Sequence, residues 1–468
     1  MNRAAPIHPE LGTGFFDPVA PAAFPKLILR YRNDRWAARV GLGQLADPAW
    51  LAHFGRFEPL PDNLASPLAL RYHGHQFRVY NPDIGDGRGF LFAQLRSDDG
   101  RVLDLGTKGS GQTPYSRTGD GRLTLKGGVR ELLATTMLEA LGVDTSKTFS
   151  LVETGEDLIR GDEPSPTRSS VLTRLSHSHI RIGTFQRLAY EQDDDRIATL
   201  VDHVLRHYMP EVSRAGDIAD RAARLLAETT ARVARTGAQW MAAGFVHGVL
   251  NTDNINVTGE SFDYGPYRFL PHYEPAFTAA YFDHGGLYAY GRQPGTLMWN
   301  LQRLAECLQL VAEETPLLAA LQTFPQHFET ALVGAMFARL NLAATDPEAD
   351  LDTVGGIFQF LHDSKMPYER FFFDWQGGAA SLARANQSPA ADFYARDDFA
   401  PLREILVGAA AAEPKRLAHP YFDEPAPCTL LIGEIEALWA AIDERDDWQP
   451  LYEKLAAITR AGEAFGNL

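Results

Sequence analysis

The sequence predicts an α+β protein of two lobes, the first rich in strands and the second mainly helical. The first half of the chain is rich in glycine and short apolar runs, whereas the second half repeats apolar residues at helical spacing. The length of 468 residues exceeds the size at which a single hydrophobic core stops growing. A polar stretch, HGVLNTDN at 247–254, interrupts the helical pattern. We therefore expect two packed lobes with a cleft between them.

The elements follow from local patterns. Strands are expected over 89–95 and 101–109, where apolar runs end in glycine turns. A helix is expected over 129–143, because apolar residues recur every three or four positions and Gly142 can stop it. A further strand over 171–175 leads into the loop SHSHIR. Three more helices are predicted from apolar periodicity over 195–209, 220–243 and 297–311.

The composition argues against several classes of protein. Lys and Arg number 44 against 60 Asp and Glu, a net charge of −16, so we expect no nucleic-acid partner, because phosphate-binding surfaces need clustered cations. Cys307 and Cys428 are too few for a disulfide scaffold, and we expect two free thiols. No stretch has the roughly 18 apolar residues of a membrane span, and the N-terminus lacks the apolar core of a signal peptide. We expect a cytoplasmic protein without a membrane partner, and a monomer.

Two glycine-rich clusters are candidates for binding phosphate. The first is IGDGRGF at 84–90, and the second is TKGSGQTPYSRTGDGR at 107–122. Glycine lets backbone N–H groups approach a phosphate closely, and Arg88 adds a fixed positive charge. A tight hairpin turn is the simpler explanation of the first cluster alone. The second cluster shifts the balance toward phosphate binding.

Lys108 and Glu131 are candidates for a functional ion pair. Lys108 lies at the end of a predicted strand and precedes Glu131, which lies early in the predicted helix. Protein kinases hold a phosphate-binding Lys on a strand and orient it with a Glu from the neighbouring helix. An exposed Lys and a solvated Glu at a helix start are the alternative.

Two arginines, Arg174 and Arg181, flank the segment LSHSHI. Two guanidinium groups from one loop could hold two phosphates in bidentate contacts, although isolated surface arginines are common. This loop and the segment YHGHQF also carry two HxH pairs, a pattern that raises the question of zinc. Because no cysteine accompanies them, hydrogen-bonded loop histidines are the better interpretation of His73, His75, His177 and His179.

The stretch HGVLNTDN and the DYG that follows it stand where protein kinases have HRDLKPEN and DFG. Val249 occupies the position of the catalytic Asp of a kinase and has no group that accepts a proton. Asn254 and Asp263 occupy the positions of the metal-binding Asn and Asp, and oxygen ligands of this kind suit Mg²⁺ or Mn²⁺. Asp253 offers a carboxylate near the missing base. An Asx turn would explain the string NTDN alone, but the Lys–Glu pair and the glycine-rich loops in kinase order favour a metal site.

Together these motifs resemble the SelO (selenoprotein O, YdiU) proteins, a family of pseudokinases. The similar stretches follow in unbroken order over residues 70–310: GHQF, GDGR, KGSGQTPYSRTGDGR, LTRLSHSHIRIGTF, GFVHGVLNTDNINVTGESFDYGPYRFL and QPGTLMWNLQRLA. The resemblance implies a protein-kinase-like bilobal fold that binds ATP in the inverted orientation, with the α-phosphate facing the acceptor. It implies a protein adenylyltransferase, dependent on Mg²⁺ or Mn²⁺, that moves AMP onto Ser, Thr or Tyr hydroxyls of protein substrates and releases pyrophosphate.

The resemblance also implies roles for individual residues. Glu131 would orient Lys108, and Asp253 would accept the proton of the acceptor hydroxyl. Asn254 and Asp263 would hold the metal ion. The residues that would contact ATP are Gly85, Gly87, Arg88, Lys108, Asp120, Gly121, Arg174, Arg181 and Asp263. Several cations would stabilise the charge of a buried triphosphate and of a departing pyrophosphate better than the single Lys of a kinase would.

On this basis we expect three segments. An N-terminal nucleotide-binding lobe with an N-terminal extension would cover 1–190. A helical lobe with the metal-binding and catalytic loop would cover 191–386, and a divergent helical extension would cover 387–468.

The sequence departs from the family pattern at several points. Where the family has YGGHQFG this chain has YHGHQFR, so His73 and Arg78 replace glycines and are expected to reshape the roof of the cleft. Ala279 stands where relatives carry a cysteine, which argues against their redox-controlling disulfide. The segment from Gln387 onward is expected to match the family poorly. Two alternatives stay open: a conventional kinase of a protein or small molecule that uses Asp253 as its base, and a catalytically silent nucleotide-binding scaffold.

Overall fold

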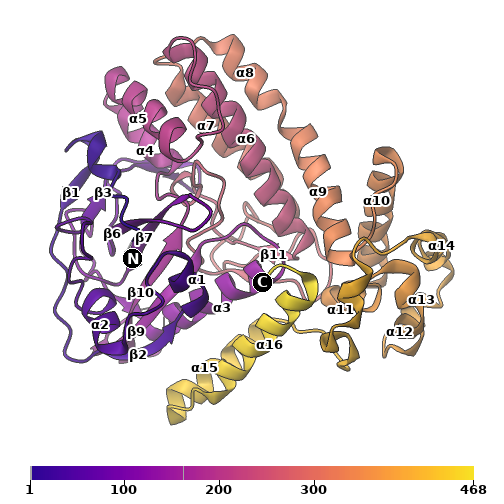
Figure 1. The fold of residues 1–468 in the computed structure, drawn as a ribbon. Helices are drawn as coiled ribbons and strands as arrows, with labels where there is room; N and C mark the ends of the chain where they lie inside the picture. The colour runs from indigo at the N-terminus through magenta and orange to yellow at the C-terminus, as the bar shows by residue number, and fades with distance from the viewer. Residues whose placement is uncertain (1–2, 162) are drawn as a thin grey trace.

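The computed structural model describes residues 3–161 and 163–468, and its first part is built on one antiparallel sheet (Figure 1). The strand order is β1-β3-β6-β7-β10-β9-β2, and the short β8 pairs with β10. The register pairs β10 with β7 so that Arg174 lies opposite Gly106 and Leu172 opposite Lys108. Arg174 and Lys108 therefore emerge on the same face of the sheet, on neighbouring strands. The strands are β1 (Phe16–Pro18), β2 (Ile28–Arg32), β3 (Leu68–Leu70), β6 (Leu91–Arg96), β7 (Val102–Lys108), β8 (Leu123–Thr124), β9 (Lys147–Leu158) and β10 (Thr167–Ser176).

The strands predicted over 89–95, 101–109 and 171–175 are confirmed as β6, β7 and the middle of β10. β9, which pairs along β10, was not predicted. Two short antiparallel strand pairs lie outside this sheet: β4 (Gly74–Gln76) with β5 (Val79–Asn81), and β11 (Phe245–Val246) with β12 (Arg268–Phe269).

Helix α3 (Leu125–Ala140) packs on one face of the sheet, against β9 and β10. It begins before the predicted start because the Thr124 side chain accepts a hydrogen bond from the Gly127 N–H at 3.2 Å and caps the helix. Its close approach to β10 requires glycine at 128, where a Cβ would lie 2.7 Å from Ser170 Oγ. Gly142, with φ of 81°, ends the helix as predicted.

The opposite face of the sheet is covered by α1 (Asp34–Arg39) and α2 (Asp47–Phe54). Trp50 of α2 stacks on Phe149 of β9, with ring centroids 5.0 Å apart. Trp36, Phe54 and Phe92 belong to the same hydrophobic cluster. The sheet is thus buried on both faces, as its largely apolar strands require.

The second part of the chain is helical, and α6 lies at its centre with α5, α7, α8 and α9 packed against it. The helices predicted over 195–209, 220–243 and 297–311 are confirmed as α5, α6 and α7, and α7 starts earlier because Pro294 suits the first turn. The helices are α4 (Ile182–Tyr190), α5 (Asp194–His207), α6 (Ile218–Ala242), α7 (Gln293–Leu308), α8 (Glu314–Gln322), α9 (Phe324–Leu340), α10 (Pro347–Ser364) and α11 (Tyr368–Asp374).

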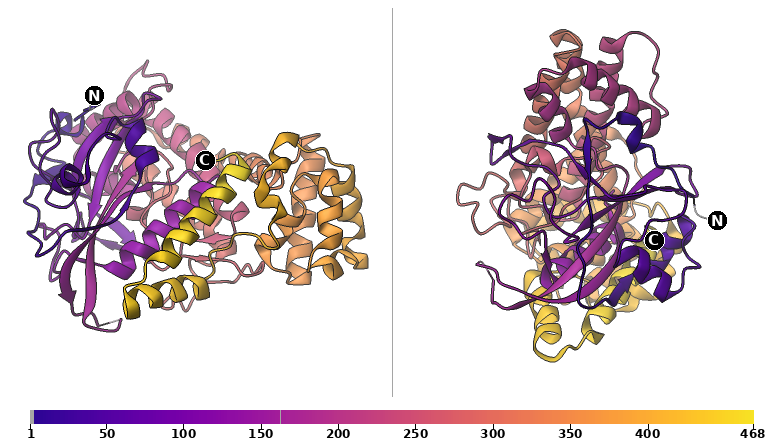
Figure 2. Two further views of the ribbon diagram at one scale, coloured as in Figure 1. Left: turned by 60° about the horizontal axis from the view of Figure 1, so that its bottom comes forward. Right: turned by 90° about the vertical axis from the view of Figure 1, so that its left-hand side faces the viewer.

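The last part of the chain, expected as one extension over 387–468, is helical and packs in two places. The short helices α12 (Leu382–Gln387), α13 (Ala391–Tyr394) and α14 (Ala400–Gly408) join α10 and α11 in a bundle away from the sheet. Helices α15 (Ile432–Arg445) and α16 (Gln449–Phe465) return to α3 and lie alongside it (Figure 2). Within the described residues, Cys307 and Cys428 are free, as predicted, and no helix combines the length and apolar character needed to cross a membrane.

Candidate active site

A buried group of ion pairs lies where the sheet, α3 and the DYG segment meet. Lys108 Nζ lies 2.7 Å from Glu131 Oε2 and 2.8 Å from Asp263 Oδ1. The side chains of Lys108 and Glu131 are only 8% and 1% exposed. The predicted contact between these two residues is therefore present, and the alternative of two solvated side chains is wrong.

Arg174 joins the same group from β10. Its Nη1 lies 3.1 Å from Asp263 Oδ1 and 3.3 Å from Glu131 Oε1. Burial would raise the pKa of the Asp263 carboxyl, but the charges of Lys108, Arg174 and Arg181 outweigh it and hold that pKa well below its usual value. Asp263 is thus ionised at neutral pH, and the two carboxylates balance the charges of Lys108 and Arg174, as a buried group requires.

Arg181 lies at the start of α4, beside this group. Its Nη2 lies 3.2 Å from Asp86 Oδ1, and its guanidinium stacks 4.2 Å from the ring centre of Tyr72. Phe262 lies 5.2 Å from the guanidinium carbons of both Arg181 and Arg174. These contacts with aromatic rings help to hold the two guanidiniums in place.

The loop that joins the two arginines is held in a strained conformation. Ser178 has φ of 94°, a backbone conformation that residues other than glycine rarely adopt. Its carbonyl accepts a hydrogen bond from Asn256 Nδ2 at 2.5 Å, and its hydroxyl accepts one from the Ile180 N–H at 2.9 Å. These bonds fix the spacing of Arg174 and Arg181.

The interpretation of the four HxH histidines as hydrogen-bonded loop residues is confirmed only in part, because His75 lies in β4 and neither ring nitrogen of His179 has a hydrogen-bond partner among the described residues. The backbone N–H groups of His177 and His179 donate to Glu260 Oε2 and Asp104 Oδ2 at 2.7 and 2.8 Å. His73 Nδ1 contacts Tyr80 Oη, and His75 Nδ1 contacts Gln186 Nε2. The group of described residues that is spaced for a metal ion contains none of these four histidines.

Asp253, Asn254 and Asp263 converge from the two kinase-like motifs. Asn254 Nδ2 donates to Asp263 Oδ2 at 3.2 Å, and Asp263 has φ of 66°, a left-handed conformation that Asp tolerates better than most residues. Asp253 Oδ1 is buried without a hydrogen-bond partner among the described residues. Burial raises the pKa of Asp253 to about 7, and Arg181 limits the rise.

A cavity of about 700 Å³ opens next to these residues. It is lined by both glycine-rich clusters and by Asp253. Its cations outnumber its acids, which favours an anionic ligand in a chain of net charge −16. Of the residues predicted to contact ATP or to act in catalysis, those in the lining are Gly85, Gly87, Arg88, Asp120, Gly121 and Asp253.

The other predicted site residues do not line this cavity and belong to the buried group or border it. Arg181 connects the two regions, because its partner Asp86 lies between the lining residues Gly85 and Gly87 and its stacking partner Tyr72 also lines the cavity. Asp120 pairs with Arg160 at 2.8 Å, so its carboxylate already has a cationic partner. The residues outside the lining are Lys108, Glu131, Arg174, Arg181, Asn254 and Asp263.

Sequence reasoning missed Asp86, Tyr72 and Phe262. Asp86 stands inside the GDGR motif that was singled out for its glycines and its Arg, so the motif itself was the available signal. Tyr72 is the first residue of YHGHQF and Phe262 directly precedes DYG, but neither carries any further local signal. Arg78, which was expected to reshape the cleft, has φ of 64°, a backbone conformation that the glycine of the family pattern would adopt without strain. Its guanidinium carbon lies 5.4 Å from the ring centre of Trp299.

Comparison with known proteins gives consistent results. The family described as "Protein adenylyltransferase SelO" matches residues 3–459. The matched range therefore includes most of the segment from Gln387 onward, which was expected to match the family poorly. The protein nucleotidyltransferase YdiU of Synechocystis sp. is 47% identical over an alignment of 469 positions that covers 94% of each chain. The protein of the same name from Trichormus variabilis is 43% identical over 97% of this chain and 95% of its own, and that from Vibrio cholerae is 36% identical over 80% and 75%.

Proposed function

Because the chain belongs to the SelO family of protein adenylyltransferases, we propose that it transfers AMP from ATP to Ser, Thr or Tyr hydroxyls of protein substrates. The acceptor oxygen attacks the α-phosphorus, the bond from that phosphorus to the oxygen bridging the β-phosphate breaks, and pyrophosphate leaves. The observation that carries the proposal is the buried group of Lys108, Arg174 and Arg181 beside a cavity lined by two glycine-rich segments. The sheet with α3 and the helices around α6 would then be the two lobes of a protein-kinase-like fold.

The three cations support an inverted ATP, with its outer phosphates directed into the buried group. Each cation is paired with a carboxylate, and these contacts would be exchanged in part for contacts with phosphate oxygens. Charge-assisted hydrogen bonds in a water-excluded site would stabilise the pyrophosphate as its charge develops. The α-phosphate would then remain in the outer part of the cavity, near Gly85, Gly87 and Asp253.

The chemistry of Asn254 and Asp263 fits a Mg²⁺ or Mn²⁺ ion. A carboxylate and an amide oxygen are hard ligands of the type that these ions prefer. Asp263 is ionised, and the Asn254 amide that faces it can present its oxygen after a flip, because the two ends of an amide have the same shape. When bound, the ion would neutralise negative charge on the phosphates.

Asp253 is our candidate for the group that accepts the proton of the acceptor hydroxyl. Val249, in the position of the catalytic Asp of a kinase, cannot take this role. Asp253 lines the cavity, and its buried Oδ1 has no partner in the described part of the chain. A free carboxylate oxygen beside the expected α-phosphate is the geometry that general-base catalysis requires.

Intact-mass spectrometry of the protein and of candidate acceptor proteins, after incubation with ATP and Mg²⁺ or Mn²⁺, tests this proposal. We expect a gain of one AMP per modified hydroxyl, which Asp263→Ala abolishes. A gain of a phosphoryl group instead would show a conventional kinase. ATP binding without a change of mass in any protein would show a nucleotide-binding scaffold.

A further inference from the structure

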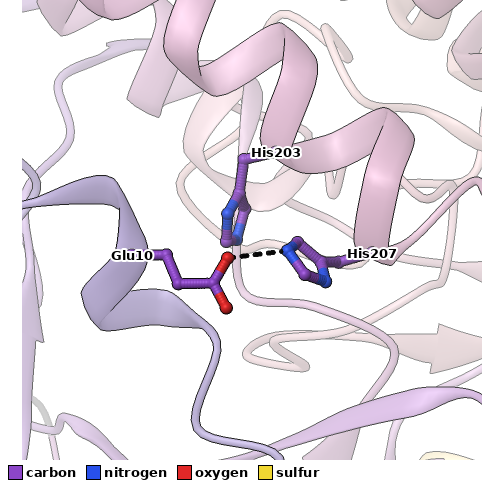
Figure 3. Close-up of side chains that lie close together, drawn as sticks. All are labelled: Glu10, His203 and His207. Carbon is purple, nitrogen blue, oxygen red and sulfur yellow. Dashed lines mark hydrogen bonds and ion pairs between the residues drawn. The ribbon is translucent and has the colours of Figure 1, made fainter. Parts of the chain in front are cut away.

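A second cluster of ligand-bearing side chains lies outside the cavity that we assign to ATP, where the N-terminal segment meets α5. Figure 3 shows Glu10, from the short helix η1 (His8–Leu11), facing His203 and His207 of α5. One ligand atom from each residue lies within 4.8 Å of the others. The two histidines are four residues apart in a helix, so their rings lie on one face, with centroids 4.7 Å apart.

An ion pair accounts for the polar atoms of only two of these three side chains. His207 Nε2 lies 3.0 Å from Glu10 Oε2. His203 is 6% exposed, and its Nε2 is buried with no hydrogen-bond partner in the residues that the structure describes. An unpaired buried nitrogen is unfavourable, and this one is directed toward the same side of α5 as the Glu10–His207 pair. A ligand that all three side chains share would satisfy it.

We propose that Glu10, His203 and His207 bind a divalent transition metal ion with the ligand preferences of zinc. Two imidazoles and a carboxylate are a ligand set found in zinc sites, with a water molecule in the fourth position. Mg²⁺ and Ca²⁺ prefer sets made of oxygen atoms and do not match it. Zinc–ligand distances of about 2.0–2.2 Å place the ligand atoms of a tetrahedral site about 3.3–3.6 Å apart, so small side-chain rotations would close this cluster. The Glu10 side chain is 50% exposed and free to make that adjustment.

The site has a route of entry and a structural consequence. His207 also lines an open cavity of about 550 Å³ between α5, α6 and the turn from β6 to β7. Residues before η1 are held to β6 through the Ala5 N–H, which donates to the Gln94 carbonyl at 2.9 Å. A metal ion would cross-link η1 to α5 and so fix the N-terminal segment against the helical part of the protein. Metal binding at this site would therefore stabilise the folded protein, and the site need not take part in the transfer of AMP.

Cobalt titration of the metal-free protein, prepared without a histidine tag, tests this site. Co²⁺ in a site with two histidine nitrogens and few ligands absorbs visible light strongly, whereas the oxygen ligands Asn254 and Asp263 give a weak spectrum, so the two sites are separable. We expect one equivalent of Co²⁺ to produce the strong absorption and Zn²⁺ to displace it. His207→Ala and Glu10→Gln should each weaken binding at least about tenfold, the loss typical of even an outer-shell change. His327→Ala, an exposed histidine on α9, is the matched control and should bind as wild type does.

Thermal unfolding gives a second readout that needs no activity. Zn²⁺ should raise the melting temperature of the wild type and of His327→Ala, and should raise it less in the two site variants. Glu10→Gln keeps the size and hydrogen-bonding capacity of a half-exposed side chain, so it tests the site even if His207→Ala folds poorly. The proposal is overturned if the wild type gives no strong cobalt absorption, or if Glu10→Gln and His207→Ala bind cobalt as tightly as the control.

Discussion

Arg174 Nη1 and Asp263 Oδ1 lie 3.1 Å apart, and Lys108 Nζ reaches the same carboxylate oxygen at 2.8 Å. One carboxylate thus holds two buried cations in place. In the proposed reaction these cations would exchange part of this contact for a triphosphate, and Asp263 would be free to hold the metal ion. On the proposed function, the pairing would act as a preformed phosphate site that is kept neutral until the nucleotide arrives.

Removal of either arginine should weaken ATP binding and leave AMP binding unchanged. Each charge-assisted contact to the outer phosphates contributes on the order of 1.5–3 kcal/mol, so Arg174→Ala and Arg181→Ala should each lower transfer about 10- to 100-fold. AMP lacks the two outer phosphates and should bind both variants as it binds the wild type. Calorimetric titrations with ATP and AMP measure this difference. If both variants bind ATP like the wild type, the inverted orientation loses its support.

Asp263→Ala should abolish metal-dependent transfer while the protein remains folded. The change removes a metal ligand and the shared partner of Lys108 and Arg174, so a lower melting temperature is also expected. Circular dichroism and transfer assays should be made on the same preparation, with Asp398→Ala, an exposed carboxylate, as the control. A folded Asp263→Ala protein that still transfers AMP would place the metal site elsewhere.

Lys108→Ala should lower transfer more than Glu131→Gln does. Lys108 would contact the phosphates directly, whereas Glu131 acts by holding Lys108 and Arg174 in position. Glutamine retains an oxygen that accepts a hydrogen bond from Lys108, so part of the positioning survives. Transfer rates and ATP dissociation constants for both variants check the order. Equal activity of Lys108→Ala and the wild type would remove this residue from the site.

Gly74→Ala should lower the rate of transfer with little effect on ATP affinity. A Cβ at this position would lie 2.9 Å from Asp253 Oδ1, so the added methyl group would displace the proposed base. Gly356→Ala, where a Cβ meets nothing within 4 Å on helix α10, should behave as the wild type. Comparison of kcat and KM separates the two effects. Wild-type kcat in Gly74→Ala would show that the position of Asp253 is not important.

Glu260→Gln should change how stability depends on pH. Burial raises the pKa of Glu260 from its ordinary value of 4.5 to about 8, and Lys147 limits the rise. Between these values the unfolded chain has lost the proton that the folded protein keeps, so this group destabilises the fold increasingly as pH rises from about 5 to 8. Gln keeps an oxygen acceptor for the His177 N–H and cannot ionise. Urea unfolding at pH 5.5 and 8 should show a smaller loss of stability in the variant, and equal losses in the two proteins would contradict the raised pKa.

Much of the fold could be predicted because its signals are local. Apolar periodicity located α5, α6 and α7, and the glycine turns located the ends of β6 and β7. The N-terminal strands β1, β2 and β3 were missed because they span only three to five residues, too few for an alternation to distinguish them. β9 was missed because its first eight residues are all buried although they mix polar and apolar side chains. The family resemblance rested on short motifs in a fixed order, which can likewise be found in the sequence without knowledge of the fold.

The sequence by itself determined which side chains are available: the Lys–Glu pair, the two arginines and the two kinase-like motifs. Only the tertiary structure decided that Asp263 neutralises both Lys108 and Arg174, that Asp86 pairs with Arg181, and that Glu10 lies against His203 and His207. These contacts join segments far apart in the chain. Local propensity fixes backbone conformation over a few residues, whereas contacts of this kind depend on how the sheet and the helices pack to bury their apolar faces. No spacing in the sequence encodes that packing.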